Sequence, residues 1–130
     1  MKIGIVGSRS LDLENVKNHM FSFLNGKRDK IDEIVSGGAA GPDTFAYEYV
    51  MANGGKFTLY RPDWKKYGKS AGFKRNVLIV NDSDVIIAFW DGASRGAKHS
   101  IDYAIRHGKK VIVFIFDEVS GEYIETKKFI

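Results

Sequence analysis

The sequence contains no cysteine. Disulfide bonds and thiolate metal sites are therefore excluded, and a reducing compartment is the simpler expectation. No apolar run approaches the length that a membrane-spanning helix needs. Residues 1–7 are strand-like and lack the longer apolar stretch and small-residue cleavage site of a signal peptide. These absences predict a cytoplasmic protein that has no membrane partner.

Low-complexity tracts, repeats of fixed period and long linkers are also absent. A chain of 130 residues has the ordinary size of one domain with one core. Its hydrophobic fraction of 44% and aromatic fraction of 13% supply enough large side chains for that core. We therefore expect residues 1–130 to form a single domain. In its tail, 117–130, Ser120-Gly121 signals a turn that a short strand follows.

The charge of the chain is positive. Its formal net charge is +4 and its pI about 9.2. That balance suits an anionic ligand, but it does not separate nucleic acid from a small phosphate compound, and an ordinary solvated surface explains it equally well. The positions of the cations therefore matter more than their number.

Short apolar runs alternate along the chain with segments of helical periodicity. The predicted strands are 2–6, 31–35, 56–60, 85–90 and 110–116. The predicted helices are 12–25, 41–53, 73–81 and 94–107, and 67–72 is expected to be a loop. Asp12 is the expected N-cap of the first helix, and Pro42 is the expected first residue of the second, where its missing N–H costs nothing.

Continuously apolar strands that alternate with helices are typical of a parallel sheet covered on both faces. We expect a Rossmann-like, doubly wound α/β domain, with helices on both faces of a five-stranded, mainly parallel sheet of order 3-2-1-4-5. In such folds a ligand binds beyond the carboxyl ends of the strands, near the point where the strand order reverses. Glycine-rich turns follow the first, second and fourth predicted strands, so we expect them to converge on that point.

The first of these turns is Gly7-Ser8-Arg9. Gly7 would let the backbone approach a ligand closely, while Ser8 offers a hydroxyl and Arg9 a guanidinium group to a phosphate. A tight turn with an exposed arginine explains the same three residues equally well.

The second turn, at 36–43, reads Ser-Gly-Gly-Ala-Ala-Gly-Pro-Asp. It leads into a helix start, where free N–H groups and the helix dipole favour an anion. Its spacing matches neither a P-loop nor the dinucleotide-binding fingerprint. Asp43 could accept a hydrogen bond from a ribose hydroxyl, or it could be only an acid that the dipole favours. The other residues expected to contact a phosphate or ribose are Gly37, Gly38, Ala39 and Gly41.

The third turn, at 91–100, has two glycines, two serines, two cations and a histidine in ten positions that open a helix. Gly96 costs the helix about 1 kcal/mol relative to alanine, which favours a role in clearing space for a ligand. His99 lacks partners at metal-ligand spacing, so no metal site is predicted. Trp90, directly before the turn, is expected in the pocket rather than in the core. The remaining residues expected to bind the ligand are Asp91, Gly92, Ser94, Arg95 and Lys98.

Aromatic and basic residues are interleaved at 63–76. Trp64 and Tyr67 could stack on a base while the cations reach phosphates, or the segment could be a basic lid that its aromatic residues anchor to the body. Arg75 and Asn76 lie in the predicted helix that follows and could face the same crevice.

These blocks resemble, in the same order, the YspA-like (cpYpsA-related) branch of the SLOG superfamily. They are Ile-Val-Ser-Gly-Gly-Ala-Ala-Gly-Pro-Asp at 34–43, the segment 63–76 and the segment 88–99, and the opening 7–9 fits as well. The resemblance extends to about Phe116. It implies a Rossmann-like domain that senses or processes nucleotide-derived ligands, with the LOG phosphoribohydrolases and the DNA-uptake protein DprA among its relatives.

The enzymatic relatives carry a Pro-Gly-Gly-x-Gly-Thr-x-x-Glu motif after the fourth strand and an arginine in the preceding helix. Arg75 matches that arginine, but Ser100 stands where the catalytic glutamate would be. The missing carboxylate argues against N-glycosidic hydrolysis, unless Asp43, Asp91 or Asp102 takes its place.

The first hypothesis is therefore a binding module for a nucleotide or nucleotide-derived small molecule, such as an ADP-ribose-like compound or a cyclic signalling nucleotide. It would act as a sensor or a sequestering protein, without a cofactor. The alternatives are a LOG-type hydrolase of nucleoside monophosphates and, as in DprA, single-stranded nucleic-acid binding. The relatives are often dimers, so a homodimer or higher homo-oligomer is a further candidate, with 114–116 and 129–130 as its contacts.

Overall fold

The computed structural model describes residues Met1–Ile130. The strands are β1 (Lys2–Gly7), β2 (Glu33–Ser36), β3 (Lys56–Leu59), β4 (Val85–Trp90), β5 (Lys110–Phe116) and β6 (Tyr123–Phe129). The α-helices are α1 (Glu14–Asn25), α2 (Pro42–Asn53), α3 (Trp64–Tyr67), α4 (Ala71–Asn81) and α5 (Arg95–Arg106). Short 3-10 helices are η1 (Arg9–Leu11), η2 (Arg28–Lys30) and η3 (Gly68–Ser70).

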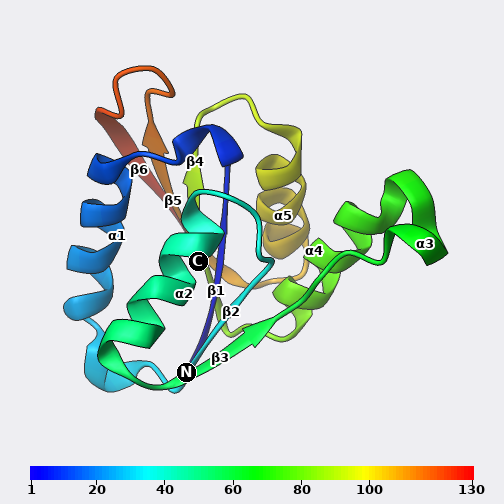
Figure 1. The fold of residues 1–130 in the computed structure, drawn as a ribbon, viewed down its shortest axis with the longest axis horizontal. Coiled ribbons are helices and arrows are strands. Elements are labelled where there is room, and N and C mark those ends of the chain that lie inside the picture. The colour runs from blue at the N-terminus through cyan, green and yellow to red at the C-terminus, as the bar shows by residue number, and fades with distance from the viewer.

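All six strands form one sheet, in the order β3-β2-β1-β4-β5-β6 (Figure 1). The first five are parallel to their neighbours, in the predicted order. The strand expected after the turn at Ser120-Gly121 is present as β6, but the prediction of a five-stranded sheet is wrong by one, because β6 pairs antiparallel with the edge of β5. Most side chains of β6 are exposed, so this strand lacks the buried face that would make its pattern clear in the sequence.

Helices cover both faces of the sheet, and each face has its own apolar core. Alternate residues of a strand point to opposite faces. In β4, Ile87 and Phe89 belong to the core beneath α1 and α2, whereas Ile86 and Ala88 belong to the core beneath α4 and α5. Figure 1 shows these two pairs of helices on either side of the strands. None of the helices combines the length and the apolar character that crossing a membrane requires.

Two helices begin elsewhere than predicted. Asp12 is not an N-cap, because η1 first carries Leu11 into the core and α1 starts only at Glu14. Residues 67–72 are not a loop, because the end of α3, the whole of η3 and the start of α4 occupy them. Ala71, the first residue of α4, is buried, which ties this earlier start to the body of the molecule.

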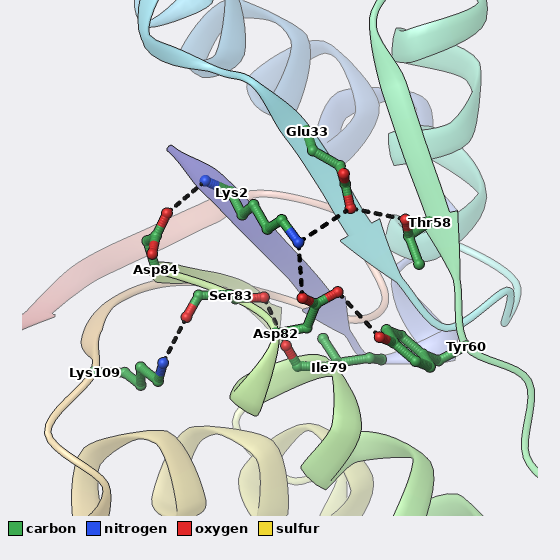
Figure 2. A network of polar contacts seen from close by, with 9 residues as sticks. All are labelled: Lys2, Glu33, Thr58, Tyr60, Ile79, Asp82, Ser83, Asp84 and Lys109. Atoms are coloured by element: carbon green, nitrogen blue, oxygen red, sulfur yellow. Dashed lines mark hydrogen bonds and ion pairs between the residues drawn. The ribbon is translucent and has the colours of Figure 1, made fainter.

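A polar network joins the amino ends of β1 and β2 to the segment before β4 (Figure 2). Lys2 Nζ lies 2.9 Å from Asp82 Oδ1 and 3.9 Å from Glu33 Oε2. Asp82 also accepts a hydrogen bond from the Tyr60 hydroxyl at 3.0 Å. Glu33 accepts one from Thr58 Oγ1 at 2.7 Å. The hydrogen bond from Lys2 is the main reason why the pKa of Asp82 is lowered. The network braces the end of the sheet opposite to the strand ends where a ligand is expected.

The apolar run 114–116, proposed above as a contact between copies, lies inside the molecule. All three of its residues are buried, since both faces of β5 are covered and β6 pairs with its edge. Of the predicted contact, only Phe129 and Ile130 are exposed.

Candidate functional site

A cleft of about 480 Å³ opens at the carboxyl ends of β1 and β4, where the strand order reverses. Doubly wound sheets bind their ligands at this position. The residues that line it are Val6, Gly7, Arg9, Ser10, Ala39, Asp43, Trp64, Lys69, Gly72, Phe73, Arg75, Asn76, Ile79, Asp91, Ser94, Gly96, Ala97 and Ser100. The structure therefore brings parts of all three glycine-rich turns together with the aromatic-basic segment.

The residues predicted to bind a ligand divide into two groups. Those that line the cleft are Gly7, Arg9, Ala39, Asp43, Trp64, Arg75, Asn76, Asp91, Ser94 and Gly96. Those that do not are Ser8, Gly37, Gly38, Gly41, Trp90, Gly92, Arg95 and Lys98. Contact of any of them with a ligand stays a prediction.

The turn after β1 is shaped by packing as much as by the cleft. A Cβ atom on Gly7 would lie 2.4 Å from Pro42 Cγ, so glycine is needed there for the close approach of α2. Ser8 is buried, and its Oγ accepts a hydrogen bond from the N–H of Asp91 at 3.1 Å. Arg9 differs from both, because its side chain lines the cleft and forms no ion pair with any carboxylate.

The loop after β2 is held by its own contacts. Gly38 and Gly41 have φ angles of 77° and 80°, a region that side chains other than glycine rarely adopt. Asp43 is buried, and its Oδ2 accepts a hydrogen bond from the N–H of Ala39 at 3.0 Å. Burial raises the pKa of Asp43, although this hydrogen bond and the charge of Arg75 act against the rise. The carboxyl of Asp43 therefore stabilises the loop from within.

Arg75 links this loop to α5. Its Nη1 donates to Gly37 O at 2.5 Å, and its Nε donates to Asn76 Oδ1 at 2.9 Å. Asn76 Nδ2 in turn donates to Gly96 O at 3.3 Å. Burial lowers the pKa of Arg75; the carboxyl of Asp43 raises it, and the nearby positive charge of Arg9 lowers it further. The attraction of the Asp43 carboxyl for Arg75 therefore exceeds the repulsion by Arg9.

The turn after β4 is organised by Asp91. Its Oδ1 accepts hydrogen bonds from the N–H groups of Ala93 and Ser94, at 2.8 and 2.7 Å. Its Oδ2 accepts one from Ser10 Oγ at 2.6 Å. Burial raises the pKa of Asp91, but these hydrogen bonds outweigh burial and hold that pKa below its ordinary value.

Among the charged residues that line the cleft, the carboxylates have hydrogen-bond partners in the protein, whereas the cations have no ion-pair partner. Both lining carboxylates, Asp43 and Asp91, already accept hydrogen bonds from within the protein. The lining cations are Arg9, Lys69 and Arg75, and none of them forms an ion pair with a carboxylate. An anion is the ligand that this arrangement favours.

Trp90 is not part of the cleft, contrary to the position favoured from the sequence. It packs against the core beneath α4 and α5, and its Nε1 donates to Ser94 O at 3.1 Å. Lys98 also points elsewhere, because its Nζ pairs with Asp102 at 2.7 Å on the exposed side of α5. Ser100 does line the cleft, and its Oγ donates to Gly96 O at 3.5 Å.

Several lining residues escaped the sequence analysis. Lys69, Gly72 and Phe73 lie in the aromatic-basic segment, where the interleaved pattern marked the region but not the individual side chains. Ser10 lies directly after the first turn, and only its contact with Asp91 distinguishes it from a surface serine.

The segment 64–74, here called the basic lobe, comprises α3, η3 and the first residues of α4; Figure 1 shows α3 projecting away from the sheet. Tyr67 is flanked by cations, with Lys66 Nζ and Lys74 Nζ 5.2 and 4.7 Å from its ring centre. Trp64 is 55% exposed and lines the cleft. The lysines of the lobe, none of which forms an ion pair with a carboxylate, are Lys65, Lys66, Lys69 and Lys74.

Comparison with known structures shows where this architecture recurs. DNA processing protein A (DprA) from Streptococcus pneumoniae superimposes on 92% of the chain with a TM-score of 0.75 and 21% identity. The chain spans only 52% of that protein. DprA from Helicobacter pylori, whose structure describes a single-stranded DNA binding mode, gives a TM-score of 0.69 at 23% identity, with 95% of this chain and 68% of the other covered. At these identities the likeness establishes a shared Rossmann-like fold.

Comparison of sequences identifies a related protein family. No protein-family model matches the chain. The Gene 61 protein of Mycobacterium phage D29 is 38% identical over 87 residues, which make up 62% of this chain and 70% of that protein. The chain therefore has the fold of the DprA proteins and belongs to the same family as the Gene 61 protein of Mycobacterium phage D29.

Proposed function

We propose that the cleft binds a nucleotide-derived small molecule and holds its phosphate between Arg9 and Arg75. The observation that carries the proposal is that two guanidinium groups line one cleft without an ion pair, while the lining carboxylates already accept hydrogen bonds from the protein. A phosphate placed between the two groups would accept charge-assisted hydrogen bonds from both. The volume of the cleft, about 480 Å³, suits a ligand of nucleotide size.

Within this proposal the protein captures its ligand rather than cleaving it. Ser100, at the position of the glutamate in the enzymatic relatives, offers only a hydroxyl group. Asp102 is paired with Lys98 outside the cleft, while Asp43 and Asp91 are occupied by hydrogen bonds from the protein itself. A role as a sensor or a sequestering protein, in the YspA-like branch and related to the LOG enzymes, belongs to the same proposal.

Thermal unfolding with a panel of AMP, ADP-ribose, a cyclic dinucleotide and ribose 5-phosphate tests the proposal. A ligand at 100 times its Kd should stabilise the protein by about 2.7 kcal/mol. Arg9→Ala should weaken binding by about 10- to 100-fold, because it removes a charged hydrogen-bond donor that makes no ion pair within the protein. Lys98→Ala removes an equal charge outside the cleft and should leave binding unchanged.

Two results would count against the proposal. One is the absence of a shift with every member of the panel, and the other is equal binding by wild type and Arg9→Ala. Chromatography of the same mixtures for free base separates capture from N-glycosidic cleavage, and no release is expected.

Single-stranded DNA is the second candidate ligand, because the basic lobe continues from the cleft with lysines that have no acidic partner and with the exposed Trp64. The fold that this chain shares with the DNA-binding DprA of Helicobacter pylori supports the same candidate. Stacking of bases on aromatic rings beside a cationic track is the usual way of binding single strands.

Fluorescence anisotropy of a labelled oligothymidine at increasing salt distinguishes this candidate. DNA binding should weaken steeply with salt, and each lysine that contacts a phosphate should contribute about 0.7 to the slope of log K against log salt. Lys65→Ala/Lys66→Ala should therefore reduce the slope, whereas Lys127→Ala/Lys128→Ala on β6 makes the same change in net charge without effect. An identical response of both double variants would argue against a specific track on the lobe.

A further inference from the structure

The two tryptophans of the chain are in opposite situations. Trp90 packs against an apolar core, and its indole N–H donates to a backbone carbonyl. Trp64 is 55% exposed, its N–H has no hydrogen-bond partner in the protein, and no other aromatic ring stacks on it. Burying a large aromatic side chain stabilises a fold. One that is exposed at the wall of a cleft therefore indicates a surface that contacts a ligand.

Two glycines keep the space in the cleft open. Gly72 and Gly96 are the second residues of α4 and α5, and neither has a positive φ angle, so the backbone does not require glycine at either position. A Cβ atom on Gly96 would meet nothing within 4 Å, and one on Gly72 would meet only the edge of Trp64, at 3.7 Å. Alanine is the better helix former at such positions. Both glycines line the cleft, so their missing side chains leave room for a ligand.

The other aromatic residues near the cleft are already engaged. Lys66 and Lys74 lie against the ring of Tyr67, and the ring centre of Phe73 is 4.5 Å from that of His99. Phe73 also lines the cleft and is 45% exposed, but His99 packs against its ring, so Trp64 is the lining aromatic residue that has no ring partner in the protein.

We infer that Trp64 is a stacking platform for a nucleobase, which occupies the space left open by Gly72 and Gly96. The inference rests on the proposed function, because the phosphate held by Arg9 and Arg75 anchors the other end of the same ligand. It narrows the ligand class to nucleotides with an intact base and excludes base-free sugar phosphates as full ligands.

Titration calorimetry with AMP, GMP, CMP, UMP and ribose 5-phosphate tests the inference. At least one nucleotide should bind about 5- to 150-fold more tightly than ribose 5-phosphate, the range that stacking on one aromatic ring provides. Trp64→Ala should remove this advantage and leave the affinity for ribose 5-phosphate unchanged, whereas Trp64→Phe should retain most of it. Gly96→Ala should weaken nucleotide binding although the folded protein is no less stable.

Tyr67→Ala is the matched control, because it removes an aromatic ring of the same lobe that does not line the cleft, and it should bind like wild type. In wild type, quenching of tryptophan fluorescence should accompany nucleotide binding and be absent in Trp64→Phe. Equal affinities for ribose 5-phosphate and all four nucleotides, unaltered in Trp64→Ala, would overturn the inference and leave the proposed phosphate site standing. Failure of these five compounds to bind, together with ADP-ribose and the cyclic dinucleotide of the thermal-unfolding panel, would overturn both.

Discussion

At the scale of single residues, glycine serves several purposes around the cleft. Gly7 and Gly37 allow close approaches, to Pro42 and to Arg75 respectively. Gly38 is needed for its backbone conformation, with a φ angle of 77°. Gly96 differs from these, because a Cβ atom there would meet nothing within 4 Å and its φ angle is not positive. The glycine-rich turns therefore build the walls of the cleft as well as its open space.

Gly37→Ala should disturb the position of Arg75 without unfolding the protein. The added Cβ would lie 2.4 Å from Arg75 Nη1, and the end of this flexible side chain must move away from its hydrogen bond with Gly37 O. We expect a loss of about 1.5–3 kcal/mol in stability, the usual range for a hydrogen bond to a charged group, and weaker nucleotide binding. Chemical denaturation and calorimetry measure the two effects. Gly26→Ala, at the end of α1 and away from the cleft, is the control; unchanged binding by Gly37→Ala would contradict the expectation.

At the scale of elements, α1 holds the added strand β6 against the sheet. The ring of His19 lies between aromatic residues of β5 and β6. Its centre is 4.8 Å from that of Phe114 and 5.1 Å from that of Tyr123. β6 is the edge strand, and the charged Lys127 and Lys128 together with a bulge near Tyr123 discourage pairing with a further chain. The packing of His19 and the bulge therefore protect this edge of the sheet, and neither can be recognised from the pattern of the strand alone.

Acid should loosen this contact. Burial lowers the pKa of His19, so below about pH 6.5 the unfolded chain binds a proton more readily than the folded protein does. Stability from this group is thus complete above that pH and falls as the pH decreases. His19→Phe removes the titrating group and keeps a ring in place. Urea denaturation from pH 8 to pH 5 should show wild type losing stability relative to His19→Phe, and a constant difference over this range would refute the explanation.

At the scale of the whole molecule, two apolar cores lie back to back and share every central strand. Leu24 of α1 is buried in one core and Ile79 of α4 in the other. Because residues of one strand alternate between the two cores, neither face can lose its packing without disturbing the other. This arrangement supports the proposal that residues 1–130 fold as one domain.

Leu24→Ala and Ile79→Ala test that proposal together. Each should lower the free energy of unfolding by about 2–5 kcal/mol, the range for truncating a large buried side chain. Each variant should still unfold in one transition, at the same denaturant concentration by tryptophan fluorescence and by far-UV circular dichroism. Separate midpoints for the two probes in either variant would show that the faces unfold independently.

Local pattern was sufficient where a segment is buried on both faces. The bounds of β4 and β5 match the predicted 85–90 and 110–116, because continuous apolar runs of that length have few alternatives. Pattern failed where stability comes from distant contacts. The short helices at 64–70 have no periodicity of their own. The strand after Ser120-Gly121 was expected but not its place in the sheet, because β6 is held by pairing with β5 and by His19.

For the candidate site, the sequence by itself determined which turns follow which strands, and hence that parts of all three turns would meet at the reversal of strand order. Only the tertiary structure decided which side chains face the opening. From the sequence, Trp90 and Trp64 were both expected to line the pocket. In the structure, Trp90 is held against the core beneath α5 and by a hydrogen bond to Ser94. Trp64 lies in the basic lobe and remains exposed. The physical reason is that chain order and periodicity place a residue along an element, whereas the direction of its side chain depends on the partners that packing brings to it.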